Sequence, residues 1–71
     1  MGVIQMKKYS LVGVNGNAFA VMGYVTQAMK ECGFPKTEQN TYMEKAMSKD
    51  YDNLLMVSME YIEQCNQRLD S

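Results

Sequence analysis

The chain has 71 residues, 46% of them hydrophobic and 21% charged, so it has room for one small domain and excludes a two-domain enzyme. Seven lysines and arginines stand against eight acids, which is not the basic surplus of a protein that binds nucleic acid by neutralising phosphates. Histidine, the commonest general base and metal ligand, is absent from the sequence, and two cysteines alone cannot complete a zinc site. We therefore expect no catalytic residues, no metal and no cofactor.

The longest uncharged stretch, residues 9–29, is long enough to raise the question of a membrane span. Five polar side chains and three glycines interrupt it, and a spanning helix would carry these polar groups into hydrocarbon. Lys7 and Lys8 ahead of apolar residues are similar to the start of a signal peptide. However, the apolar run ends after residues 9–14, which is shorter than the 7 to 15 or so residues that a signal peptide needs. We therefore expect a cytoplasmic protein that does not bind a membrane.

Residues 7–14 have the pattern of a β-strand. They are rich in β-branched and aromatic types, and Lys8, Ser10, Val12 and Val14 alternate with Tyr9, Leu11 and Gly13. Asn15 and Gly16 then tolerate the positive φ of a turn, and Asn17 is a good N-cap. The sequence predicts a strand that leads directly into a helix.

A first helix is predicted over residues 17–32. Its apolar positions step by four and three along one face: Ala18, Met22, Val25, Met29 and Cys32, with Phe19 widening the stripe. Gly33 suits the left-handed position after a helix, Phe34 can fold back on the last turn, and Pro35 cannot continue the helix. Gly23 costs a helix about 1 kcal/mol relative to alanine, so we expect a packing reason for it.

Two further helices are predicted over residues 38–48 and 51–68. Thr37 can cap the first of these, and the Thr41–Glu44 capping box is an alternative one turn later. Asp50 can cap the second. The expected fold is therefore a mainly α single domain, residues 1–71, in the order β-α-α-α.

Sulfur-containing side chains should supply much of the core. Cys32 and Cys65 lie among apolar residues near predicted helix ends, so we expect reduced core thiols rather than a disulfide. Six of the eight methionines fall on predicted helix faces, where we expect them to form helix contacts: Met22, Met29, Met43, Met47, Met56 and Met59.

Two features of this expected fold lack a partner. A single strand leaves two open edges, so it either pairs with the same strand of a second copy or lies over the helices as extended coil. The apolar arc over residues 54–62 of the last helix is also wider than the roughly 100° that a surface helix buries. Its excess is either central core or a surface for a dimer or another partner. The residues predicted for such an interaction are Tyr9, Leu11, Met56 and Met59.

Two sequence blocks, Val12–Gly23 and Ser48–Leu55, together resemble a family of short bacterial proteins, many of them carried by phages or other mobile elements. Members of that family tend to have aspartate where this chain has Asn15, a change that preserves the turn and cap chemistry. The resemblance implies no activity. It implies a bacterial, mobile-element context.

Three function classes can be compared on these residues. Catalysis has little support, because the cysteines lack a histidine base and Glu60 and Glu63 fall on the expected solvent side of the last helix. A DNA-binding dimer that inserts a two-stranded ribbon into the major groove is the alternative, with Lys8 and Ser10 on one ribbon face. The acidic balance and the absence of arginine before Arg68 count against it. The preferred hypothesis is a non-catalytic protein that acts by association with itself or with another protein.

Overall fold

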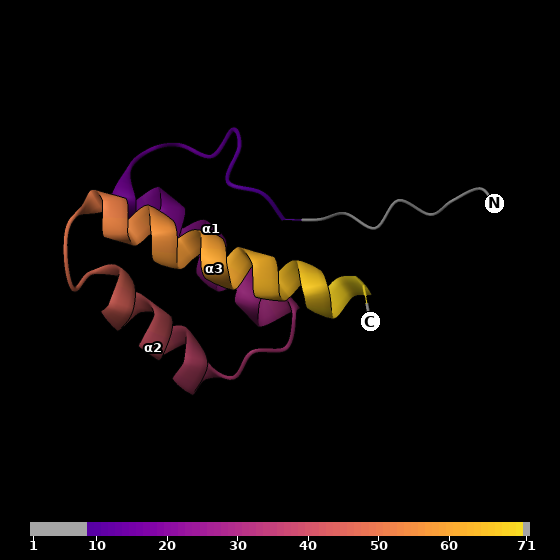
Figure 1. Ribbon diagram of the computed structural model, residues 1–71. Coiled ribbons are helices and arrows are strands. Elements are labelled where there is room, and N and C mark those ends of the chain that lie inside the picture. The colour runs from indigo at the N-terminus through magenta and orange to yellow at the C-terminus, as the bar shows by residue number, and fades with distance from the viewer. Residues whose placement is uncertain (1–8, 71) are drawn as a thin grey trace.

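Three α-helices follow an N-terminal segment in the computed structural model, which describes residues 9–70, with side chains to residue 68. The helices are α1 (Ala18–Glu31), α2 (Lys36–Ala46) and α3 (Tyr51–Asp70). Short connections make neighbouring helices antiparallel, so α1 and α3 run in the same direction and α2 runs against both (Figure 1). The described part of the chain is a small all-α domain.

Helix α1 begins and ends at the residues that the sequence indicates. The Asn17 side chain accepts a hydrogen bond from the backbone N–H of Phe19 at 2.8 Å. At the other end Gly33 has a φ of 93°. The N–H of Phe34 donates to the Met29 carbonyl at 2.8 Å, and the N–H of Gly33 donates to the Lys30 carbonyl at 3.2 Å. This is the Schellman pattern, and it brings the Phe34 ring into the core.

Helix α2 begins two residues earlier than expected, at Lys36. Its N-cap is Pro35, which makes no side-chain cap bond, so the predicted Thr37 cap is wrong. The alternative cap at Thr41 is also wrong, because Thr41 lies inside the helix and its hydroxyl donates to the Thr37 carbonyl at 3.0 Å. Proline has the backbone φ that the start of a helix requires. The side-chain amide of Gln39 donates a hydrogen bond to the carbonyl of Phe34, just before the helix, at 3.2 Å.

Helix α3 begins where the sequence places it. The Asp50 carboxylate accepts from the Asn53 N–H at 3.0 Å, as an N-cap does. The Asn53 side chain in turn donates to the Lys45 carbonyl at 2.9 Å near the end of α2. The two bonds fix the turn between α2 and α3.

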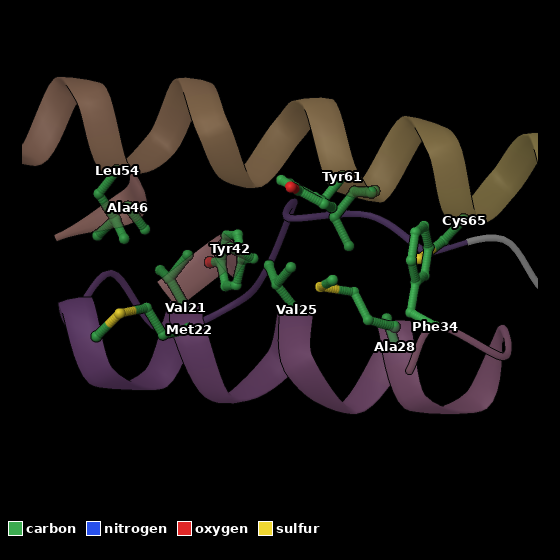
Figure 2. Close-up of a cluster of buried hydrophobic side chains, with 12 residues drawn as sticks. Val21, Met22, Val25, Ala28, Phe34, Tyr42, Ala46, Leu54, Tyr61 and Cys65 are labelled. Atoms are coloured by element: carbon green, nitrogen blue, oxygen red, sulfur yellow. The ribbon is translucent and has the colours of Figure 1, made fainter. Parts of the chain in front are cut away.

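The core lies along the seam where α1, α2 and α3 meet, as Figure 2 shows. Its fully buried side chains include Val25, Met29, Tyr42, Ser58 and Cys65. Three aromatic rings pack edge to face: Tyr61 lies 5.3 Å from Tyr42 and 6.1 Å from Phe34 between ring centroids.

The predicted strand is the main error of the sequence-based fold. Residues 9–14 form no strand, and residues 7 and 8 lie outside the described part of the chain. The chain instead turns at 11–14, where the Val14 N–H bonds the Leu11 carbonyl at 3.1 Å and Gly13 has a φ of 85°. Type II turns place glycine at this third position. A turn in the middle of the period-two pattern prevents a continuous strand.

Two expectations about α1 are also wrong. Phe19 does not widen the buried stripe, since 76% of its side chain is exposed. Gly23 has no packing reason, because a methyl group added there would meet nothing within 4 Å.

The methionines divide between core and surface. Of the six methionines expected in helix contacts, Met22 and Met29 are buried, whereas Met43, Met47, Met56 and Met59 are exposed.

Within residues 9–70, no helix combines the length and the apolar character needed to cross a bilayer.

Candidate interaction groove

A groove of about 790 Å³ runs between the N-terminal segment and one face of α3. The segment 9–12 forms one wall, and α3 residues between Leu55 and Asn66 form the other. Figure 1 shows this segment on the side of α3 away from α2. The lining residues are Tyr9, Ser10, Leu11, Val12, Leu55, Met56, Met59, Glu60, Ile62, Glu63 and Asn66.

Side-chain hydrogen bonds hold the first wall in place. The Asn66 amide accepts from the Tyr9 N–H at 2.8 Å and donates to the Tyr9 carbonyl at 2.9 Å. The N–H of Ser10 donates to the hydroxyl of Tyr24 at 2.8 Å. Three backbone groups that a strand would offer to a partner are thus bonded within the chain.

The Tyr9 ring is fixed at both ends. It packs edge to face on Tyr24 with the ring centroids 6.3 Å apart, and its hydroxyl donates to Glu31 at 2.6 Å. That hydrogen bond, together with burial and the glutamate charge, raises the pKa of the Tyr9 hydroxyl above its ordinary value. The phenol therefore serves as a neutral anchor between α1 and the segment.

All four residues predicted for interaction line this groove. Met56 and Met59 lie on its α3 wall with 57% and 61% of their side chains exposed, while Tyr9 and Leu11 are half-buried on the opposite wall. The sequence placed Tyr9 and Leu11 there for the wrong reason, because it treated them as part of an open strand edge.

Sequence reasoning missed the residues that give the groove its chemical character. Val12 projects from the turn with 91% of its side chain exposed. Glu60 and Glu63 are exposed, as expected for the solvent side, but both line the groove. The spacing could have found them, because residues 56, 59, 60 and 63 are three and four apart and so share one helix face.

The α3 lining of the groove combines apolar side chains, which we call its apolar base, with two carboxylates, which we call its acidic rim. Leu55, Met56 and Met59 supply apolar surface, and Glu60 and Glu63 supply the charges. The one basic residue of α3, Arg68, lies away from this rim: its guanidinium lies 3.8 Å from the centre of the Phe34 ring and bonds the Cys32 carbonyl at 3.3 Å. Among the lining residues of the groove, the two charged side chains are therefore both acidic.

The described residues offer little reactive chemistry. No group of three histidine, cysteine, aspartate or glutamate side chains within that part of the chain is placed to hold a metal ion. Cys32 and Cys65 are free, and the Cys32 thiol donates to the Cys65 carbonyl with the two atoms 3.7 Å apart. Burial first, and then the neighbouring Cys32 thiol, raise the pKa of Cys65 to about 12, so it is a poor nucleophile at neutral pH.

A smaller hollow of about 270 Å³ lies between the start of α1 and the α2–α3 turn. The exposed side chains of Phe19, Met47 and Tyr51 border it. The Tyr51 hydroxyl donates to the Gly16 carbonyl, which ties the start of α3 to the segment before α1. This hollow is a third of the size of the groove and contains one residue of each charge, Lys49 and Asp50.

The chain matches no family profile, no curated protein and no solved structure. Its function is therefore inferred from the groove and from the residues that line it.

Proposed function

We propose that this is a small non-catalytic protein that acts by protein–protein association through the groove between residues 9–12 and α3. The observation that carries the proposal is the pair Met56 and Met59, both more than half exposed beside the exposed Val12. Soluble proteins rarely expose contiguous large apolar side chains without a use for them, and methionine adapts to varied partner surfaces.

The groove is also built to persist without a partner. Tyr9 and Ser10 are held by Asn66, Tyr24 and Glu31, so its two walls are fixed relative to each other. A preformed apolar site loses less conformational entropy on binding than a flexible one. The occupant is a second copy of the chain or a different protein, and the resemblance described above favours a bacterial, mobile-element setting.

Residues 9–14 do not form the strand that the ribbon-type DNA-binding alternative requires. A two-stranded ribbon needs free backbone N–H and C=O groups along the pairing edge. Here the groups of Tyr9 are bonded to Asn66 and the N–H of Ser10 is bonded to Tyr24. No observation in the described residues favours nucleic acid over protein as the partner.

Photo-crosslinking in the cells from which the chain comes would test the proposal. Benzoylphenylalanine replaces Met59 in the groove, and in a matched control it replaces Glu44, which is exposed on α2 outside the groove. We expect discrete crosslinked products from position 59 that position 44 does not give. A product of twice the 8.1 kDa chain mass identifies a second copy, and other masses identify a different protein.

Light scattering at micromolar concentration separates the two kinds of occupant further. A dimer that the Met59→Lys substitution converts to monomer supports self-association through the groove. The proposal is contradicted if position 59 gives the same products as position 44 and the protein is also monomeric.

A further inference from the structure

We propose that the occupant of the groove is a cationic amphipathic segment of another protein, with apolar side chains on one face and lysine or arginine flanking them. This inference rests on the proposed function and names the chemistry of its partner. It follows from how the groove combines an adaptable apolar base with an acidic rim.

The apolar base runs along one face of α3. Leu55, Met56, Met59 and Ile62 line the groove, and their spacing is that of one side of a helix. The wall from Leu55 to Asn66 extends about 17 Å at 1.5 Å per residue. An amphipathic helix of three turns presents an apolar stripe of about this length, and helix-in-groove binding uses such stripes.

The acidic rim selects the charge of the partner. Glu60 and Glu63 are exposed one turn apart at the groove, and α3 as a whole carries four acids against one arginine. That arginine, Arg68, is held against Phe34 and Cys32. Cations flanking the apolar stripe of a partner would therefore meet carboxylates on the rim, and charge complementarity of this kind favours the correct partner over others.

The same charges disfavour a symmetric dimer through the groove. A two-fold interface uses the same patch on both copies, so it would bring the four carboxylates of Glu60 and Glu63 into one interface with no lysine or arginine among the lining residues of the groove to pair with them. Like charges facing each other in an interface are costly. The described lysines on and next to α2, Lys36, Lys45 and Lys49, do not line the groove. A segment from another protein avoids this repulsion.

The test uses synthetic peptides with the full-length protein. The probe is a fluorescein-labelled helix of about 14 residues, about 21 Å long, with leucine on one face and lysine on the other. One control peptide has glutamate in place of every lysine, and a second has the lysine peptide's composition in scrambled order. Binding is measured by fluorescence anisotropy at about 50 mM and about 500 mM salt, because rim charges lose strength when screened.

We expect the ordered lysine peptide to bind at least about tenfold more tightly than either control peptide. The double substitution Glu60→Gln, Glu63→Gln should weaken that binding by about threefold to tenfold, since exposed ion pairs contribute modestly. The matched double substitution Glu38→Gln, Glu44→Gln on α2 changes the net charge equally and should leave binding unchanged. Met59→Gln should weaken binding of the lysine peptide at both salt concentrations, because it removes apolar contact rather than charge.

The inference is overturned if the glutamate peptide binds as well as the lysine peptide, or if the α2 substitutions weaken binding as much as the rim substitutions. It is also overturned if none of the three peptides binds and Met59 supports a dimer, because the groove then belongs to a second copy. In each of these cases position-specific crosslinking at residue 59 would still support association through the groove, so the two proposals can fail separately.

Discussion

Asn66 bonds both backbone polar groups of Tyr9: its amide accepts from the N–H at 2.8 Å and donates to the carbonyl at 2.9 Å. A neighbouring strand would offer the same donor and acceptor to this residue. One side chain on α3 thus bonds backbone groups of Tyr9 that the predicted strand over residues 7–14 would offer to a partner strand. It also fixes the wall of the groove to the helix that forms its other side.

We expect Asn66→Ala to destabilise the protein by about 1–2 kcal/mol, because two hydrogen bonds are lost and two backbone groups must find water. Asn66→Asp should destabilise it too, since a carboxylate accepts from the Tyr9 N–H but repels the Tyr9 carbonyl. Urea unfolding measures both changes, and Gln67→Ala at the exposed neighbouring position is the control. If Asn66→Ala unfolds at the same urea concentration as the wild type, the pairing with Tyr9 contributes nothing to stability.

A fully buried hydrogen bond joins Tyr42 of α2 to Ser58 of α3, with their hydroxyl oxygens 2.6 Å apart. Ser58→Ala should cost about 1–3 kcal/mol, because it strands the Tyr42 hydroxyl in the core. Tyr42→Phe should cost less, since Ser58 can turn its hydroxyl to the carbonyl four residues earlier in α3.

A double-mutant cycle measures this coupling by thermal or urea unfolding. The double variant Tyr42→Phe, Ser58→Ala should be clearly more stable than the sum of the single losses predicts, since it leaves no buried hydroxyl. Strict additivity of the two changes would contradict a bond that contributes to stability.

Gly23 and Gly33 should respond oppositely to alanine. Gly23 lies in α1 with nothing within 4 Å of an added methyl group, so Gly23→Ala should stabilise the protein by about 0.5–1 kcal/mol. Gly33 has a φ of 93°, and Gly33→Ala should cost about 1 kcal/mol or more because the left-handed conformation strains a Cβ. Unfolding midpoints of the two variants measure the contrast. If Gly23→Ala instead lowered stability and weakened peptide binding, the prediction would be wrong and Gly23 would be needed for a contact.

The main error of the sequence-based fold, the predicted strand, has a partly long-range origin. Asn17, Asp50 and Gly33 act through neighbours a few residues away, so the pattern was sufficient to place the ends of the helices that they cap. The backbone of Tyr9, within the predicted strand, is instead bonded by the side chain of Asn66, which lies 57 residues further along the chain. No local sequence pattern shows this contact. Long-range side-chain bonds of this kind decide the structure of short segments and are invisible to periodicity.

The lining of the groove was predictable to a similar extent. Met56 and Met59 were identified because α3 has more apolar surface than its neighbours cover, which composition and spacing reveal. The acidic rim was read as ordinary solvent-exposed surface, because a helix pattern does not show which part of the polar face borders a groove. Only the position of residues 9–12 beside Glu60 and Glu63 makes that distinction.

The buried thiol of Cys65 should make stability fall in alkaline solution. Its pKa is raised from the ordinary value near 9 to about 12, first by burial and then by the Cys32 thiol. Between these values the unfolded chain releases the proton while the folded chain retains it. The folded state then binds more protons, and its stability decreases as pH rises. Below pH 9 both states keep the proton and this contribution is constant.

Urea unfolding between about pH 8 and pH 9.5 would measure the onset of this loss separately from the tyrosines. Tyr9 and Tyr42, whose pKa values are raised above the ordinary 10.0 in the folded protein, add a similar loss only as the unfolded chain begins to titrate near pH 10. Cys65→Ala should flatten the decline in the unfolding midpoint over this range, even though the variant is less stable throughout because it leaves a cavity. Cys32→Ala should retain most of the decline, because burial is the larger cause of the shift at Cys65. An unfolding midpoint that falls equally steeply in the wild type and in Cys65→Ala would show that another group is responsible.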